Sequence, residues 1–272
     1  MSDRSWDYIH GYSNTEQERL IQQAQFWRDD LILRDINYNS GDRLLEIGCG
    51  AGAVLGILAT AFKELKIAGI DIEAKQIEYA RKYIDSLNIV NADLKIGDAS
   101  QLPWQDNTFE RIYMMWFLEH LSDPLSILQE AKRVLKPQGT IDIIETDYRT
   151  IVITPHSPDY QYLQNSLCEL LLQSGGDPYI GQSLGNLLGE VGFNKVENRA
   201  LSFHYNSHQN PQQLLEFISY VDSWLAPTVP QIADKLGKDK AKLSNGLEEF
   251  RNVGIKENSA VTAVIYKATA TK

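Results

Sequence analysis

The chain has 272 residues, of which 43% are hydrophobic and 23% charged, and its formal net charge is −10. This composition is typical of a globular protein, and the acidic balance argues against the broad basic face with which proteins follow a nucleic-acid backbone. No apolar run is long enough to span a bilayer, and MSDRSWDYIH lacks the apolar core of a secretory signal. Since only Cys49 and Cys168 are present, we expect no disulfide and a cytoplasmic location.

Residues 1–40 precede the first predicted strand and carry several aromatic side chains near their start. Ser13 and Glu16 have the spacing of a capping box, which predicts a helix from about Thr15. Two interpretations of the aromatic side chains stay open: they close over a ligand as a lid, or they pack a terminal helix onto the body. These side chains are Trp6, Tyr8 and Tyr12.

The stretch LLEIGCGAG, residues 44–52, predicts a buried strand that turns sharply into a helix. Glu46 lies near the end of the strand, at the edge where open α/β sheets bind ligands. Gly48 and Gly50 let the backbone approach a ligand because no Cβ stands in the way. With Ala53 the run also satisfies the dinucleotide pattern G-x-G-x-x-A, and a tight turn without any ligand is a further alternative.

Each of the next two predicted strands is followed by an aspartate. Residues 67–70 form a short apolar strand, and the carboxylate of Asp71 after it can accept hydrogen bonds from both hydroxyls of a ribose. Because a helix starts at about Ala74, the alternative role of Asp71 is a helix cap. The pair Asp98 and Ala99 follows the third strand.

Four segments taken together resemble the class I S-adenosylmethionine-dependent methyltransferases, in particular the small-molecule branch related to the ubiquinone and menaquinone enzymes. They lie between residues 40 and 147 and read LLEIGCGAG, AGID, IGDASQLPWQDNTFE, and FLEHLSDP with RVLKPQG. Trp104, Glu110 and Gln138 depart mildly from the pattern of the family. The resemblance implies S-adenosyl-L-methionine as the cofactor and a Rossmann-like fold.

The resemblance also implies roles for single residues. The Asp98 carboxylate and the backbone N–H that follows it would meet the adenine, and Asp71 would meet the ribose. The N-terminal GYSNTEQERL is similar to a segment that closes over the cofactor in some small-molecule methyltransferases. The expected cofactor contacts are Tyr12, Glu46, Gly48, Gly50, Asp71, Ile72, Asp98, Ala99 and Met115.

The alternation of strands and helices predicts an α/β fold with a doubly wound, mostly parallel, seven-stranded sheet and right-handed crossovers. A sixth strand is expected at 194–205 and a last strand at 260–268, which the family inserts antiparallel beside the sixth. Segments 148–180 and 206–257 leave the carboxyl edge of the sheet, so we expect them to form a helical cap over the cofactor. The expected organisation is a lid at 1–40 and a methyltransferase domain at 41–272 with these two cap insertions.

Methyl transfer from a sulfonium is an in-line displacement, so the protein mainly has to hold donor and acceptor together in a dry pocket. A base is needed only when the acceptor loses a proton. His120 is the candidate base, with a role in orienting the adjoining helix as the alternative. Glu145 and Asp147 end the fifth strand and are expected near an acceptor hydroxyl or amine. The weaker candidates in or beside the cap are His156, His204 and His208.

These observations together predict methyl transfer from S-adenosylmethionine to O, N or C of a small, largely apolar organic acceptor. We expect no nucleic acid, no membrane insertion and, since no metal-ligand spacing occurs, no metal. The alternatives are an RNA or protein methyltransferase, a non-catalytic S-adenosylmethionine-binding module and an NAD-dependent oxidoreductase. The acceptor depends on how the cap side chains point, and the oligomeric state has no signal in the sequence.

Overall fold

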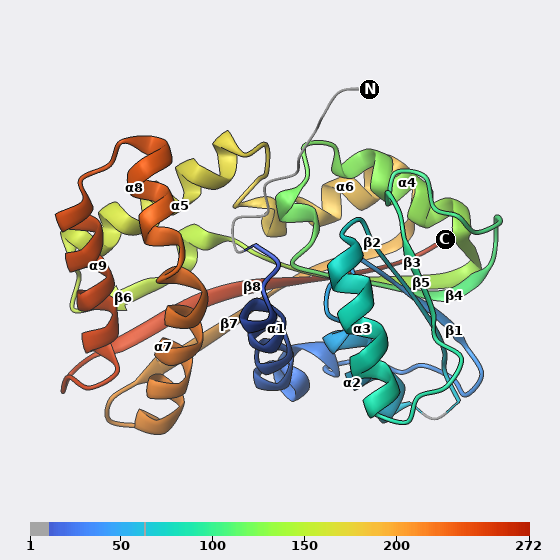
Figure 1. Ribbon diagram of the computed structural model, residues 1–272, viewed down its shortest axis with the longest axis horizontal. Coiled ribbons are helices and arrows are strands. Elements are labelled where there is room, and N and C mark those ends of the chain that lie inside the picture. The colour runs from blue at the N-terminus through green and yellow to red at the C-terminus, as the bar shows by residue number, and fades with distance from the viewer. Residues whose placement is uncertain (1–10, 63) are drawn as a thin grey trace.

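The computed structural model describes residues 11–62 and 64–272, and its centre is one eight-stranded sheet (Figure 1). The strand order is β3-β2-β1-β4-β5-β8, with β6 and β7 also paired to β8. The strands are β1 (Arg43–Ile47), β2 (Lys66–Asp71), β3 (Asp93–Ile96), β4 (Phe109–Met115), β5 (Leu135–Thr146), β6 (Val152–Thr154), β7 (Asn194–Asn206) and β8 (Ala260–Thr271).

Strands β1 to β5 are parallel, which confirms the fold expected from the alternation of elements. The apolar run of β1 is buried because helices cover both faces of the sheet, and Leu44, Leu45 and Ile47 are fully buried. One face packs on α1 (Asn14–Phe26), α2 (Ala53–Ala61) and α3 (Ala74–Ser86). The other packs on α4 (Pro124–Val134) and α6 (Leu184–Val191).

The last strand, β8, runs antiparallel between β5 and β7, and its place beside β7 is the one that the family resemblance implied. The expected sheet of seven strands was one strand short. Residues Val152–Thr154 form β6 inside the first insertion and pair with β8 at residues 260–262. Because β5 pairs with β8 only from residue 265 onward, β6 extends the same side of β8 beyond the end of β5.

The N-terminal helix α1 begins where the capping pattern predicted. The Ser13 Oγ accepts a hydrogen bond from the Glu16 backbone N–H at 3.2 Å, which is half of a capping box. The Glu16 carboxylate instead pairs with Arg19 one turn on, at 2.6 Å. A π-helical turn, Arg28–Ile32, follows α1 and is partly buried.

The two insertions fold into four helices that lie together at one end of the molecule (left in Figure 1). They are α5 (Pro158–Gln173), α7 (Pro211–Leu225), α8 (Thr228–Leu236) and α9 (Lys240–Val253). Helix α9 approaches α5 so closely that a Cβ at Gly246 would lie 2.3 Å from the Asp159 carbonyl oxygen. The rings of Tyr160 and Phe250 stack across the same contact, 5.2 Å apart.

Three short 3-10 turns complete the fold, at Leu118–His120, Tyr148–Thr150 and Ile180–Ser183. In the described ranges, no helix combines the length and the apolar character needed to cross a membrane.

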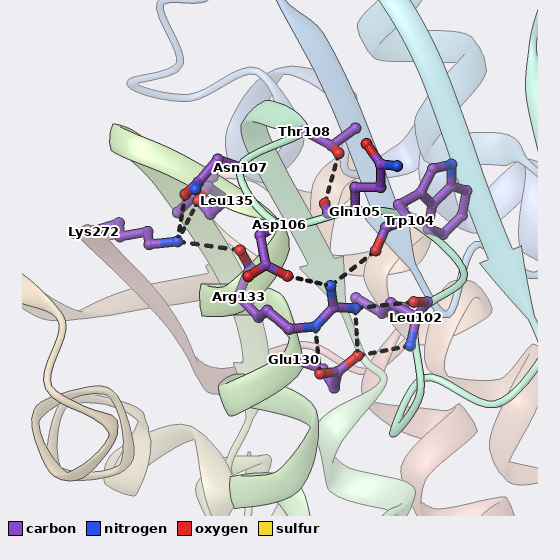
Figure 2. Close-up of polar contacts among 10 residues, drawn as sticks. All are labelled: Leu102, Trp104, Gln105, Asp106, Asn107, Thr108, Glu130, Arg133, Leu135 and Lys272. Atoms are coloured by element: carbon purple, nitrogen blue, oxygen red, sulfur yellow. Dashed lines mark hydrogen bonds and ion pairs between the residues drawn. The ribbon is translucent and has the colours of Figure 1, made fainter.

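Arg133 of α4 holds the long connection between β3 and β4 (Figure 2). Its guanidinium donates to the carbonyl oxygens of Leu102 and Trp104, each at 2.9 Å, and to Asp106 at 2.8 Å. Glu130 pairs with the same guanidinium and also accepts the Leu102 backbone N–H. The two sequence segments LPWQDNTFE and RVLKPQG are therefore joined in space, and this junction fixes the loop that begins with Asp98.

Candidate active site

A cavity of about 580 Å³ opens at the carboxyl ends of the parallel strands, beneath the cap. All ten residues expected at the site line this cavity, although they come from segments more than a hundred residues apart. They are Tyr12, Glu46, Gly48, Gly50, Asp71, Ile72, Asp98, Ala99, Met115 and His120. The cavity thus brings the predicted set together, and the role of each residue stays a prediction. Two lid aromatics proposed from the sequence, Trp6 and Tyr8, lie outside the described residues.

The glycine turn after β1 forms the floor of one half of the cavity. The backbone N–H groups of Gly48 and Cys49 donate to the Ile70 carbonyl oxygen at 2.9 and 3.0 Å, which binds the turn to the end of β2. Gly48 has a φ of +73°, and a Cβ there would lie 2.2 Å from the Phe117 ring. Only glycine fits this position without a shift of the aromatic side chain.

Asp71 accepts two backbone hydrogen bonds, both at 2.9 Å. One comes from Gly50 in the glycine turn and the other from Glu73 at the start of α3. The N-cap of α3 is Glu73, so the alternative that Asp71 itself caps this helix was wrong. A carboxylate oxygen has two lone pairs, so each Asp71 oxygen keeps one for a further donor. Burial raises the pKa of Asp71 despite the two donors.

Glu46 is buried next to the glycine turn, at 3% exposure. Its Oε2 accepts the Leu55 backbone N–H of α2 at 3.1 Å, so this carboxyl group holds the start of α2 against β1. Burial raises the pKa of Glu46 well above its ordinary value, and the nearby Asp71 carboxylate adds to the rise.

The loop after β3 forms another wall of the half of the cavity that contains the glycine turn. Asp98 Oδ1 accepts the Ser100 backbone N–H at 2.8 Å, a local turn that fixes the side chain beside Ala99. Asp98 is exposed, and Ile72 across from it at the end of β2 keeps 51% of its surface exposed. An apolar surface so exposed at the rim of a cavity suits contact with a flat apolar ring.

The other half of the cavity is aromatic. Trp27 follows α1, Trp116 follows β4, and α7 of the cap contributes Phe217, Tyr220 and Trp224. The rings meet edge to face: Trp27 lies 5.7 Å from Tyr220 and 6.4 Å from Trp116 between ring centroids. Such a wall is mostly apolar with a few polar atoms, as in pockets for organic ligands.

His120 sits between the two halves. Burial lowers its pKa to about 4, so the imidazole is neutral at neutral pH and is a weak base. Its Nε2 lies 3.6 Å from Glu119 Oε1, and 26% of the side chain stays exposed toward the cavity. The proposal of His120 as the general base stays a prediction.

Sequence reasoning missed Glu119, although it stands in the same LEH segment as His120. Its side chain is 2% exposed and lines the cavity. The Tyr148 hydroxyl donates to Glu119 Oε1 at 2.9 Å. Burial raises the pKa of Glu119 to about 7, close to the pH at which a general base works best. The sequence did contain a signal for Glu119, because it is an acidic residue that follows a strand end. The neighbouring His120 was assigned as the candidate base instead.

The other acids and histidines considered from the sequence do not line the cavity. Glu145 is fully buried behind it and accepts the backbone N–H groups of Phe117 and Leu118 at 3.0 and 2.7 Å. Asp147 pairs with Arg149 at 2.7 Å. His204 and His208 bond to Thr262 and Asn258, respectively. The last of the set, His156, is exposed on the loop before α5.

Within residues 11–62 and 64–272, no three His, Cys, Asp or Glu side chains are placed to hold a metal ion.

The comparisons with known proteins agree with this geometry. A family model described as a methyltransferase domain matches residues 45–143. A 37.1 kDa protein of Streptomyces fradiae, from transposon Tn4556, is 31% identical over 170 residues, which cover 60% of this chain and 46% of the relative. A demethylmenaquinone methyltransferase of Bacillus cereus is 28% identical over 133 residues, 48% of this chain and 56% of that enzyme. The chain therefore spans about half the length of the curated relatives it matches.

Among solved structures, a Haemonchus contortus phosphoethanolamine N-methyltransferase superposes with a TM-score of 0.64 at 15% identity. The match covers 100% of this chain and 60% of that one, whose crystals hold phosphomonomethylethanolamine and S-adenosylhomocysteine. At this identity the likeness shows the fold, which is the Rossmann-like methyltransferase fold.

Proposed function

Since residues 45–143 form a class I methyltransferase domain, we propose that this chain binds S-adenosylmethionine and transfers its methyl group to a small, largely apolar organic acceptor. The observation that carries the proposal is one cavity with two chemically different halves. One half holds the glycine turn with Asp71 and Asp98, and the other is the aromatic wall under the cap.

The first half fits S-adenosylmethionine because it presents carboxylates that accept hydrogen bonds beside the glycine turn. Glycine at position 48 keeps the turn in shape against the Phe117 ring, and the free lone pairs of Asp71 beside this turn suit the two hydroxyls of a ribose. Asp98 and Ala99 lie at the carboxyl end of β3, where an adenine would lie against the exposed face of Ile72. When bound, the sulfonium supplies the methyl group as an electrophile.

The residues of this chain exclude water from the cavity and orient the acceptor. The cap helices and α1 cover the carboxyl edge of the sheet and exclude water from it. The walls formed by Trp27, Trp116 and Trp224 orient an acceptor by shape and by ring contacts. Since a methyl transfer needs mainly alignment and dryness, these walls supply most of what the reaction requires.

Two further parts of the proposal concern partners and location. The net charge of −10 supports a small-molecule acceptor over a nucleic acid. A demethylmenaquinone methyltransferase among the relatives supports an organic ring as acceptor. We also propose that the protein acts in the cytoplasm, where its two buried, unpaired cysteines stay reduced.

Calorimetry with S-adenosylhomocysteine and with NAD tests the proposal. We expect binding of S-adenosylhomocysteine and no measurable binding of NAD. Tighter binding of NAD would favour the oxidoreductase alternative. Binding of S-adenosylhomocysteine together with transfer of a labelled methyl group to RNA or protein, and to no small molecule, would favour the macromolecular alternative.

A further inference from the structure

Glu119, which lines the cavity, and Glu145, which is fully buried behind it, form a pair of carboxyl groups. One oxygen of each is already committed: Tyr148 donates to Glu119 Oε1, and backbone N–H groups donate to Glu145 Oε1. The remaining atoms, Glu119 Oε2 and Glu145 Oε2, are buried and have no donor among the described residues. Two buried oxygens without donors are costly unless a proton lies between them.

A shared proton accounts for both oxygens. Burial raises the pKa of Glu145 well above its usual range, and the Glu119 charge raises it further, so Glu145 keeps its proton. A hydrogen bond with Glu145 lowers the pKa of Glu119 in turn, although burial outweighs it and leaves that pKa at about 7. Above pH 7 the pair therefore carries one proton and one negative charge, and the charge rests on Glu119, the member that lines the cavity. Near pH 7 the form with a second proton, on Glu119, is also present.

The surroundings of Glu119 leave this charge available for proton transfer. Within the described residues, the groups placed against Glu119 are His120, Glu145, Tyr148, Asp177 and Tyr220, and none of these is a fixed cation. Arg19 also lines the cavity and acts on Tyr220, and its guanidinium pairs with Glu16 at 2.6 Å. His120 is neutral at neutral pH because burial lowers its pKa to about 4. A carboxylate that forms no ion pair can take up a proton without the loss of such a pair.

Hydrogen-bond donors in the aromatic half favour a hydroxyl over an amine as the acceptor group that gives its proton to Glu119. The indole nitrogens of Trp27 and Trp224 are buried and make no hydrogen bond of good geometry within the described part of the chain. Both indoles lie close enough to the Tyr220 hydroxyl to lower its pKa, which burial nevertheless raises to about 12. Tyr220 is therefore protonated, and because both indole N–H groups lie near its oxygen, its hydroxyl proton is the donor that this wall presents. Donors stabilise an oxygen that gains negative charge, whereas an amine whose lone pair is consumed has nothing to accept them.

We propose that Glu119 is the terminal proton acceptor of the transfer, acting through the Tyr148 hydroxyl, and that the acceptor is an organic molecule with an ionisable hydroxyl on an apolar ring or enol. The inference rests on the proposed methyltransferase function and narrows its substrate. The acceptor hydroxyl gives its proton to Tyr148 Oη as Tyr148 gives its own to Glu119 Oε1. An electron pair of the resulting oxyanion, on the oxygen or on a ring carbon conjugated with it, forms the new bond to the methyl carbon. The carbon–sulfur bond breaks with its electrons going to sulfur, and Glu119 loses the proton to water when the product leaves.

A labelled-methyl assay with a small panel of probes tests this. The hydroxyl probes are 1-naphthol, catechol and 1,4-naphthohydroquinone, and the amine probes are benzylamine and ethanolamine. We expect methylation of at least one hydroxyl probe and of neither amine. With the accepted probe, kcat/KM should rise with pH through an inflection near pH 7 and level off above it. Glu119→Gln and Tyr148→Phe should each lower kcat/KM by about 100-fold or more, which is the scale of a lost proton transfer.

The variants also separate catalysis from structure. Glu119→Gln should lose the inflection in the pH profile, whereas Glu169→Gln, which removes a partly exposed ion pair between α5 and Lys238 at a position that does not line the cavity, should keep both rate and profile. Affinity for S-adenosylhomocysteine should be unchanged in Tyr148→Phe, so a lower rate there is not a loss of fold. Methylation of amines only, an inflection lost in His120→Asn but kept in Glu119→Gln, or cofactor binding without transfer to any hydroxyl probe would each overturn the inference. Failure to bind S-adenosylhomocysteine would instead overturn the proposed function itself.

Discussion

Asp71 accepts a hydrogen bond from the Gly50 backbone N–H at 2.9 Å and thereby ties the end of β2 to the glycine turn that follows β1. The acid and the turn are 21 residues apart in sequence, yet they form one structural unit at the mouth of the cavity. A single side chain thus holds the turn in shape and presents its remaining lone pairs to a ligand. Loss of this carboxylate should be felt both in folding and in binding.

We expect Asp71→Ala to weaken S-adenosylhomocysteine binding by on the order of 2–3 kcal/mol, about 30- to 150-fold in Kd, because two hydrogen bonds to a charged group are lost. Stability should fall by about 1–2 kcal/mol as well, since the Gly50 and Glu73 N–H groups lose their acceptor. Calorimetry and chemical denaturation measure the two effects. The control Asp85→Ala, on the exposed side of α3, should change neither. Unchanged affinity with lower stability would assign Asp71 a structural role only.

Gly48→Ala should damage the same turn by a steric route. The added Cβ would lie 2.2 Å from the Phe117 ring at a φ of +73°, so both the backbone and the aromatic side chain must move. We expect lower thermal stability and a large loss of S-adenosylhomocysteine affinity. Gly189→Ala in α6 is the matched control, because nothing lies within 4 Å of the position and alanine favours a helix by about 0.5–1 kcal/mol. Equal behaviour of the two variants would contradict this account.

The sequence could bring the glycine turn, Asp71 and Asp98 to one half of the cavity because that half is built from local units. The glycine turn and Asp71 belong to short strand–turn–helix units whose shape follows from a few residues. The sequence left a helix cap open as the alternative role of Asp71 because Asp71 and Glu73 both precede α3, and only the coordinates show that Glu73 accepts the N–H of Lys75 in the first turn. A sequence pattern does not show which of two acids placed two residues apart accepts the N–H groups at the start of a helix.

The aromatic half of the cavity was much harder to predict, because contacts between residues far apart in the sequence form it. The contact between Glu119 and Tyr148 joins residues 29 apart because they follow the ends of β4 and β5, which pair side by side. Helix α7 reaches the same wall from almost a hundred residues further on. Amphipathic spacing predicted helices in the cap, but it could not say which apolar residues face the cavity and which face α9. The short strand β6 was missed for the same reason, since three residues pair only because β8 offers a free edge there.

Arg133→Ala should loosen the loop that carries Asp98. The variant removes the donors to the Leu102 and Trp104 carbonyl oxygens and leaves Glu130 without its partner. We expect a loss of roughly 1–3 kcal/mol in unfolding free energy and a weaker affinity for S-adenosylhomocysteine, with little change in the acceptor KM. Lys82→Ala, which breaks an exposed pair within α3, should stay within about 0.5 kcal/mol. A stable Arg133→Ala protein with normal cofactor affinity would show that the loop holds its shape without this junction.

The pH dependence of stability should carry opposite contributions from Glu119 and His120. The pKa of Glu119 is raised to about 7 in the folded protein, so its contribution to stability falls as pH rises from its unfolded value near 4.3 to 7. The pKa of His120 is lowered to about 4, so its contribution rises with pH from 4 to its unfolded value near 6.5. Between about pH 4.3 and 6.5 the two slopes oppose each other, each at most about 1.4 kcal/mol per pH unit.

Denaturation of two variants across this range separates the slopes. Relative to the native sequence, Glu119→Gln should gain stability as pH rises from 4.5 to 6.5, because the falling contribution is gone. His120→Asn should lose stability over the same interval. Identical pH profiles for the native protein and both variants would mean that neither side chain titrates abnormally in the folded state.

The cap should set the acceptor without affecting the cofactor. Val221 of α7 is buried and lines the aromatic half of the cavity, whereas Val253 of α9 is equally buried but does not line it. Both Val→Ala changes remove two methyl groups from the cap, at a cost on the order of 2 kcal/mol each in unfolding free energy. Only Val221→Ala adds room beside the acceptor. We expect it to raise the kcat/KM ratio of bulky over small hydroxylated acceptors and to leave S-adenosylhomocysteine affinity nearly unchanged, while Val253→Ala keeps the native preference. A change of acceptor preference in Val253→Ala but not in Val221→Ala would show that cap stability, and not the shape of this wall, selects the substrate.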